Sequence, residues 1–217
     1  IGTNLENMSK HHRNRNWAPA PQPLPEDAHV IDNHTHVASV VPFSQAMSHE
    51  AMEKGQGEVP VYSVDELLEQ AQKVGVEGVI DCGCELPNLM TAIDMAREHP
   101  GTVHAAIAIH PNEAVLHGHR GAPGPDGLPI KYKPWHDIPF DEAMAEVHRL
   151  ATTYPNQVVA IGETGMDLFR TGESAKELQR EAFRAHVALA KELNLPMQIH
   201  DRDSHKEVIE TLLADGA

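Results

Sequence analysis

The chain has few cysteines and few aromatic residues, and both shortages exclude a class of protein. Its 217 residues include two cysteines, Cys82 and Cys84, which flank Gly83. Cysteines this close rarely reach the geometry of an unstrained disulfide, so a disulfide-stapled secreted domain is excluded. We expect free, buried thiols in a reducing cytoplasm. Because aromatic residues make up 4% of the chain, aliphatic side chains must fill most of the core.

Long apolar runs and an excess of cationic charge are also missing. No apolar stretch approaches the ~20 residues of a membrane-spanning helix, so we expect no membrane contact. The chain has 32 Asp and Glu residues and 17 Lys and Arg residues, which gives a formal charge of −15. This charge disfavours nonspecific attraction to nucleic acid or to anionic membranes. A phosphate-bearing substrate would therefore need local help, such as bound cations.

The N-terminal part differs in composition from the rest. Residues 1–27 are basic and then Pro-rich, which suits a flexible, extended arm better than a helix. Residues 1–7 precede Met8 and are interpreted as an expression remnant. We expect one folded domain over residues 28–217.

From residue 29 onward, apolar runs typical of strands alternate with helical patterns, which indicates βα units and a parallel sheet. Strands are predicted near residues 29–34, 77–82, 103–109, 158–162 and 196–200. Helices are predicted after a capping box at Ser63 and over residues 86–98, 140–154, 174–194 and 204–214. Eight such units close an α/β barrel of ~250 residues. The chain thus has about five of eight units. We favour a barrel fragment over an open, doubly wound sheet.

Two insertions follow predicted strands, over residues 37–62 and 111–139. In a barrel both would lie over the active-site face, where long loops often contact substrate. The second insertion carries cationic and stacking groups: Arg120, Lys131, Tyr132, Lys133 and Trp135. A substrate-contacting loop and a solvated excursion are equally open interpretations.

The segment Asp32-Asn33-His34-Thr35-His36 is the strongest chemical signal in the chain. In a strand, Asp32, His34 and His36 project from one face, so two imidazoles can bind one metal while Asp32 orients a ring. A His-x-His pair alone occurs by chance. Here the His-x-His pair ends an apolar run, and other metal-binding residue types, a Glu and a His, follow later apolar runs. This recurrence favours a metal site.

Glu163, His200 and Arg202 also lie at or near strand ends. A carboxylate such as Glu163 at the end of a buried strand is unfavourable unless it is paired or binds a cation, and its two oxygens can bridge two metals. The alternative is a helix-capping or salt-bridged Glu. His200 is predicted as a ligand, with a hydrogen-bonded core histidine as the alternative. Arg202 beside a metal could clamp phosphate in bidentate fashion.

His110 ends the third predicted strand. It could bind the phosphate of a substrate or act in proton transfer, and structural hydrogen bonding is an equally open role.

Four motifs together resemble a known family: Asp-x-His-x-His, Ile-His-Pro, Gly-Glu-Thr-Gly-Met-Asp and Ile-His-x-Arg. In this order and spacing they are similar to the TatD family of metal-dependent deoxyribonucleases in the amidohydrolase superfamily. The resemblance runs from about Val30 to the chain end. It implies a distorted TIM barrel and a phosphodiesterase site with one or two metals. The matching ligands are His34, His36, Glu163 and His200, of which Glu163 would bridge.

The chain also departs from this family. A later His-containing strand and a Thr-Asp strand, which supply further ligands in the family, do not occur in these 217 residues, so we expect part of the site only. The aromatic residues after Gly-Leu-Asp become Leu168-Phe169-Arg170, which puts the substrate contacts there in doubt.

The predicted function is cleavage of DNA phosphodiester bonds by metal-activated water, as an exonuclease. Glu163 and His110 would be catalytic, and Arg202 and His110 would contact the substrate. One or two divalent ions are expected, and Zn, Mn, Mg, Fe or Ni all suit mixed His and carboxylate ligands. The alternatives are another amidohydrolase that acts on a lactone, amide or phosphotriester, and an inactive fragment that binds a metal or a partner.

Overall fold

The structure, a computed structural model, describes residues 23–25, 27–55, 60–119 and 129–216. Most of the predicted arm and Arg120 lie outside these ranges. At the end of the arm, the backbone N–H of Leu24 donates to the carbonyl of Val74 at 2.8 Å. In the described ranges, no helix has the length and apolar character needed to span a membrane.

Five parallel strands form one sheet, and their order in space is their order in the chain. They are β1 (Val30–Thr35), β2 (Val76–Gly83), β3 (Val103–Ile107), β4 (Val158–Asp167) and β5 (Met197–Arg202). A doubly wound sheet needs a reversal of strand order, so the sequential order excludes that alternative. The predicted α/β fold with five βα units of a barrel is confirmed.

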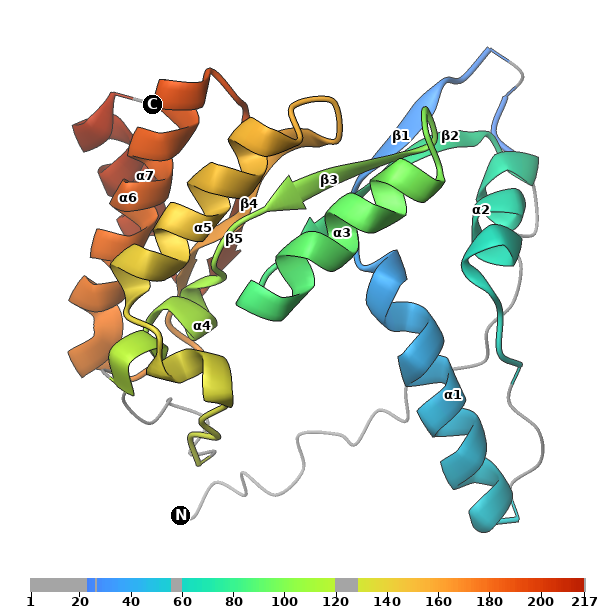
Figure 1. Cartoon of the computed structure of the whole chain (residues 1–217), viewed down its shortest axis with the longest axis horizontal. Helices are drawn as coiled ribbons and strands as arrows, with labels where there is room; N and C mark the ends of the chain where they lie inside the picture. Colours follow the sequence, from blue (N-terminus) through green and yellow to red (C-terminus); the bar gives the residue numbers. More distant parts are fainter. Residues whose placement is uncertain (1–22, 26, 56–59, 120–128, 217) are drawn as a thin grey trace, which may run out of the picture.

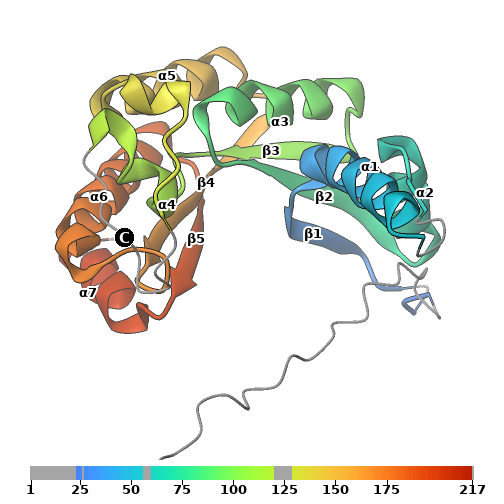
Figure 2. The ribbon, with the colours of Figure 1, turned by 90° about the horizontal axis from the view of Figure 1, so that it is seen from below.

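Most of the helices lie along one side of a curved sheet (Figure 1). The helices are α1 (Val37–Glu53), α2 (Val64–Lys73), α3 (Leu86–Glu98), α4 (Pro111–Ala114), α5 (Phe140–Thr153), α6 (Lys176–Leu193) and α7 (His205–Asp215). The short helices η2 (His117–His119) and η3 (Pro134–Asp137) follow α4, and η4 (Glu173–Ala175) precedes α6. Figure 2 shows α2, α3, α5, α6 and α7 on the convex side of the sheet, whereas α1 extends away from the end of β1.

The main core lies between the sheet and the helices on its convex side. It includes Leu89 and Ile93 of α3, Ile107 of β3, Leu150 of α5 and Ile161 of β4, all of them buried. Because side chains alternate along a strand, the neighbours of these strand residues face the concave side. A small cluster of Cys82, Ala106 and Ala160 lies there. These short side chains leave room on the concave side for polar groups.

Two elements differ from the sequence prediction. Most of the first insertion is the helix α1, which buries only Ser44, Ser48 and Ala51. A helix with so small a buried face lacks a clear apolar stripe, and Pro42 inside it is a breaker signal. Strand β4 continues to Asp167, beyond the predicted end at residue 162.

Glycines allow this extension of β4 by letting it approach β5 closely. The register between the two strands shifts between Ile161 and Thr164. A Cβ atom at Gly162 would collide with Gln198, and one at Gly165 would collide with the carbonyl oxygen of His200. Gly165 also has a φ of +146°. The position of Glu163 between these glycines therefore depends on the absence of side chains on both sides.

We predict that Gly165→Ala lowers the free energy of unfolding by ~1–3 kcal/mol more than Gly101→Ala does. Gly101 is a matched control because it also has a positive φ, +82°, but an added Cβ would have no neighbour within 4 Å. Denaturant unfolding of both variants measures the difference. Equal destabilisation would show that the close approach to β5 does not constrain the strand.

A buried histidine holds the end of the third βα unit. His186 of α6 accepts the backbone N–H of Ile109 at Nε2 (3.0 Å) and donates from Nδ1 to the carbonyl of Ala182 (2.7 Å). With one nitrogen accepting and the other donating, the ring has no place for a second proton. Burial lowers the pKa of His186 to about 4. This neutral ring fixes the backbone next to His110.

We predict that His186 makes stability depend on pH between about 6.5 and 4. The unfolded chain protonates this histidine below about pH 6.5 and the native chain does not, so acidification removes about 3 kcal/mol of stability through this group. Unfolding of His186→Gln across this range should show a weaker pH dependence than wild type. His49→Gln, at an exposed position of α1, is the control. Identical pH profiles for wild type and His186→Gln would contradict the assignment.

Candidate metal centre

Glu163 is a buried carboxylate that lies between two pairs of histidines. Its Oε2 is 3.3 Å from Nε2 of His34 and 3.7 Å from Nε2 of His36. Its Oε1 is 2.5 Å from Nδ1 of His200 and 3.8 Å from Nε2 of His110. Each oxygen thus faces one pair of imidazoles. The structure brings together all five residues that the sequence suggested as ligands or catalytic groups.

These residues form two donor groups that could each hold a metal ion. His34, His36 and Glu163 make one group, and His110, Glu163 and His200 make the other, with donor atoms within 4.8 Å of one another in each. Imidazole and carboxylate donors in this mixture fit a divalent transition metal. The carboxylate common to both groups is placed as a bridging ligand would be.

The first pair comes from the junction between β1 and α1. His36 is the residue that precedes α1, and its Nδ1 donates to the carbonyl of Cys82 at 3.3 Å. The rings of His34 and His36 meet edge to face, with centroids 5.3 Å apart. Oδ1 of Asp32 accepts the backbone N–H of His34 at 3.2 Å. The predicted contact of Asp32 with an imidazole ring is not among the contacts of the described residues, so that role stays a prediction. The carbonyl of Cys82 orients one ring instead.

In the second pair, the rings of His110 and His200 differ in their protonation state. Nδ1 of His110 accepts the backbone N–H of Asn112 at 3.2 Å, so in the neutral ring the proton sits on Nε2. That nitrogen lies 3.2 Å from Nδ1 of His200. His200 places both ring nitrogens against carboxylates, Nδ1 against Glu163 and Nε2 against Asp167 at 3.1 Å. These contacts favour the doubly protonated ring of His200.

The pKa values follow from burial and from these contacts. Burial raises the pKa of Glu163. The hydrogen bond with His200 and the charges of nearby histidines outweigh this effect and lower the pKa to about 2. Burial lowers the pKa of His200, but Asp167 and Glu163 raise it to about 9. Burial, and then the charge of His200, lower the pKa of His110 to about 4. A metal that binds here must displace the proton of His200.

Asp167 is a residue of this site that the sequence analysis missed. Its side chain is buried, and Oδ2 accepts from Nε2 of His200 and, at 3.0 Å, from Nδ2 of Asn112. Glu163 and Asp167 are four residues apart in the same strand, so they belong to the same face by alternation. This periodicity would have revealed Asp167 if β4 had been predicted at its full length.

The buried side chain of Gln179, from α6, fixes the backbone of Asp167. Its Oε1 accepts the N–H of Asp167 at 2.9 Å, and its Nε2 donates to the carbonyl of the same residue at 3.1 Å. Nε2 also donates to Oγ1 of Thr171 at 2.9 Å. Oδ1 of Asp167 accepts the backbone N–H of Phe169 and of Arg170. Hydrogen bonds to the backbone of Asp167 and to its Oδ1 therefore fix the carboxylate that faces His200.

Arg202 lies at the end of β5 and stacks on an aromatic ring. Its guanidinium carbon is 3.9 Å from the ring centroid of Phe169, and that of Arg170 is 5.6 Å from the same ring. A guanidinium on an aromatic face keeps its N–H groups available at its edge. Phe169, in the segment Leu168-Phe169-Arg170 that departs from the family pattern, thus packs against Arg202, the predicted phosphate-binding residue.

A cavity of about 550 Å³ opens beside the first histidine pair. Residues that line it include His36, Asp81, Cys82, Cys84 and Glu85. Both cysteines are free, as predicted, with Cys82 buried and Cys84 half-buried. Burial and the charge of Glu163 raise the pKa of Cys82 to about 12, so this thiol is not a nucleophile at neutral pH.

The chain matches a family model described as TatD related DNase over residues 31–217. It is 32% identical over 154 residues to YabD of Bacillus subtilis, described as an uncharacterized metal-dependent hydrolase, covering 71% of this chain and 50% of that protein. It is 32% identical over 148 residues to the 3'-5' ssDNA/RNA exonuclease TatD of Erwinia tasmaniensis, covering 68% of this chain and 48% of that protein. The chain spans about half the length of these curated relatives.

Solved structures share the fold. The TatD homologue YJJV of Escherichia coli K12 superposes with a TM-score of 0.58 at 23% identity, over 85% of this chain and 55% of that chain. A TatD family hydrolase of Entamoeba histolytica gives a TM-score of 0.57 at 20% identity, over 87% of this chain and 55% of that one. The five βα units therefore have the arrangement found in these larger proteins.

We predict that Glu163→Gln weakens binding of Zn²⁺ or Mn²⁺ at least about tenfold, because it removes the anionic oxygens shared by both donor groups. Isothermal titration calorimetry measures affinity and stoichiometry. Glu77→Gln is the matched control, because Glu77 also pairs with a histidine, His29, but at an exposed position of β2. Unchanged binding by Glu163→Gln would place the metal elsewhere.

Proposed function

Since the chain belongs to the TatD related DNase family, we propose that the protein is a metal-dependent nuclease that hydrolyses phosphodiester bonds of DNA. One observation carries the proposal: the two oxygens of buried Glu163 each face a separate pair of histidines. The Erwinia tasmaniensis relative is described as a 3'-5' ssDNA/RNA exonuclease, which supports a single-stranded substrate.

In this proposal His34, His36, Glu163 and His200 hold one or two divalent ions. Bound ions would polarise a phosphoryl oxygen and lower the pKa of a water molecule. The donor set favours Zn, Mn, Fe or Ni, and Mg is compatible when carboxylates and water dominate. Asp167 keeps His200 in place through the contact with Nε2, so a ligand from β5 reaches the carboxylate of β4.

Two further side chains would act on the substrate. His110 is neutral at pH 7 and carries its proton on Nε2, the nitrogen that faces Glu163, so it can donate a hydrogen bond to a phosphoryl oxygen. Arg202 presents the edge of its guanidinium beside the site and can bind a phosphate by two parallel hydrogen bonds. Together they would orient the phosphodiester, which lowers the entropic barrier of the reaction.

We predict that the protein degrades a 3'-labelled single-stranded oligonucleotide in Mn²⁺, and that EDTA abolishes this activity. Glu163→Ala should reduce the rate at least about 100-fold, because the ions lose the ligand shared by both donor groups. Denaturing gel electrophoresis of the products gives rate and direction, and Glu77→Ala is the control. Activity that survives both EDTA and Glu163→Ala would contradict the mechanism. Hydrolysis of a lactone panel without cleavage of DNA would favour another amidohydrolase reaction.

A further inference from the structure

The segment Lys131–Trp135 is anchored to the helix that begins at the metal centre. Nε1 of Trp135 and Nε2 of His136 both donate to Oε2 of Glu113, at 3.2 and 2.7 Å. Glu113 lies in α4, which begins directly after His110. His136 is buried, and its Nδ1 accepts the backbone N–H of Lys133 at 2.9 Å. The position of the segment is therefore fixed relative to His110.

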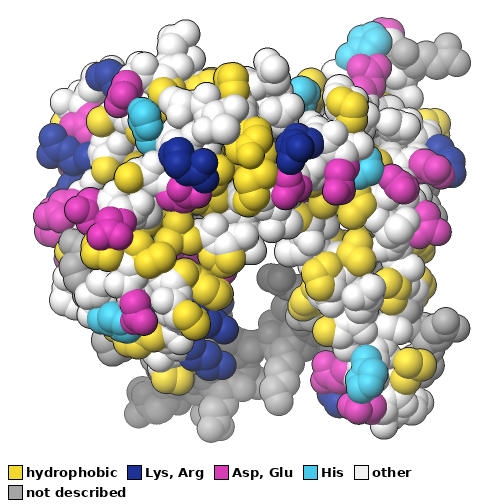
Figure 3. All heavy atoms as spheres, viewed as in Figure 1, with side chains coloured by type: hydrophobic (Ala, Val, Ile, Leu, Met, Phe, Trp, Pro, Cys, Tyr) yellow, Lys and Arg dark blue, Asp and Glu magenta, His cyan; other side chains and the backbone are white. Residues whose placement is uncertain are grey.

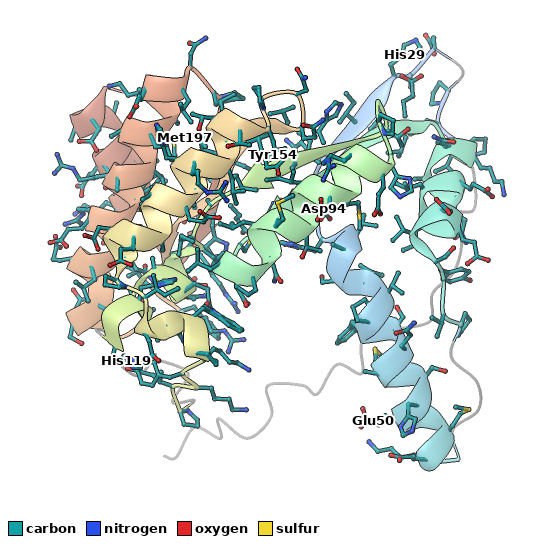
Figure 4. The ribbon with its side chains drawn as sticks, in the orientation of Figure 1. His29, Glu50, Asp94, His119, Tyr154 and Met197 are labelled. Carbon is teal, nitrogen blue, oxygen red and sulfur yellow. The ribbon has the colours of Figure 1, made fainter. Side chains whose placement is uncertain are left out.

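Tyr132 is an exposed aromatic residue in this segment. Its side chain is 43% exposed. Its ring lies against the ring of His119, with centroids 4.4 Å apart and planes inclined by 53°. His119 is held in turn by Oδ1 of Asp137 at 2.5 Å. Figure 4 shows His119 at the end of the molecule that carries η2 and η3. The ring of Tyr132 is thus supported on one side and offers surface to solvent.

The lysines on either side of Tyr132 form no ion pair within the described part of the chain. Lys131 and Lys133 are both exposed, and neither forms an ion pair with another described residue. Every other lysine in the described ranges contacts a carboxylate or carbonyl oxygen: Lys54, Lys73, Lys176, Lys191 and Lys206. In a chain of net charge −15, two unpaired lysines around an exposed tyrosine form a local cationic patch.

This patch lies at the same end of the sheet as the metal centre. Burial and then the charge of Glu113 raise the pKa of Glu85, whereas the charges of His136 and Lys133 lower it, so these side chains lie near Glu85. Glu85 precedes α3 and lines the cavity beside His36. In the space-filling view a hollow separates the part of the molecule with α4 and η3 from the part with α1 (Figure 3). Because η3 begins directly after Lys133, the patch belongs to the η3 side of this hollow.

We propose that Lys131, Tyr132 and Lys133 form a platform that binds the strand of a single-stranded nucleic acid next to the metal centre. The proposal rests on the proposed nuclease function and names a substrate contact for it. An unpaired base can stack on the Tyr132 ring, whereas the bases of a duplex are already stacked on each other. The two lysines would neutralise the phosphates on either side of that base.

The test is fluorescence anisotropy of labelled oligo(dT), in EDTA to prevent cleavage, with the full chain. Tyr132→Ala should bind about tenfold more weakly, and Tyr132→Phe should bind like wild type, because the contact is made by the ring face. The double variant Lys131→Ala/Lys133→Ala should reduce the slope of log K against log salt by about 1.4. The matched control, Lys73→Ala/Lys206→Ala, removes two exposed lysines that already pair with acidic residues.

Circular dichroism of each variant establishes that it is folded. Equal affinity of Tyr132→Ala and wild type for oligo(dT) would overturn the platform, as would binding of a labelled duplex as tight as that of the single strand. Failure of the wild type to cleave DNA, with binding that still depends on Tyr132, would instead contradict the nuclease function and keep the platform as a single-strand binding site. The two proposals therefore fail by different observations.

Discussion

A carboxylate inside a strand is the constraint on which the rest of this site depends. Burial of ionised Glu163 is unfavourable unless each oxygen has a partner. The partners come from β1, from the turns that follow β1 and β3, and from β5. Because they belong to different βα units, no local segment can satisfy Glu163 alone. The donors therefore assemble only when the strands are paired, so the candidate metal centre depends on the folding of the sheet.

Around these donors lies a network of hydrogen-bonded polar side chains. Asp167 faces His200, and Gln179 holds the backbone of Asp167 by its N–H and its carbonyl. Asn112 links the turn that carries His110 to β4, because it contacts both His110 and Asp167. Buried networks of this kind fix orientation when they are satisfied. A ligand ring that is already oriented loses little freedom when an ion binds, which favours tight coordination.

The sequence analysis placed His34, His36, Glu163 and His200 at strand ends because each ends or follows an apolar run, whereas Glu163 and His200 lie within β4 and β5. It did not predict Asp167, since Gly162 and Gly165 indicate a loop unless the closeness of β5 is known. Helix α1 was missed for a related reason: its buried face consists of two serines and one alanine. Long-range packing decides both features, and a local pattern cannot report it. The roles of the site residues stay predictions.

The acidic composition and an anionic substrate are compatible because charge acts over a limited distance. At physiological ionic strength, exposed charges more than about 8 Å apart are largely screened, so the net charge of −15 acts weakly on a bound strand. Several arginines pair with acidic residues of their own helices, as in Arg97 with Asp94 and Arg149 with Glu146. Arg202 instead stacks on Phe169, and Lys131 and Lys133 form no ion pair with another described residue. In the proposed function, the distribution of the cations, more than their number, would determine where a phosphate chain binds. The acidic remainder of the surface favours the divalent ions that such a site requires.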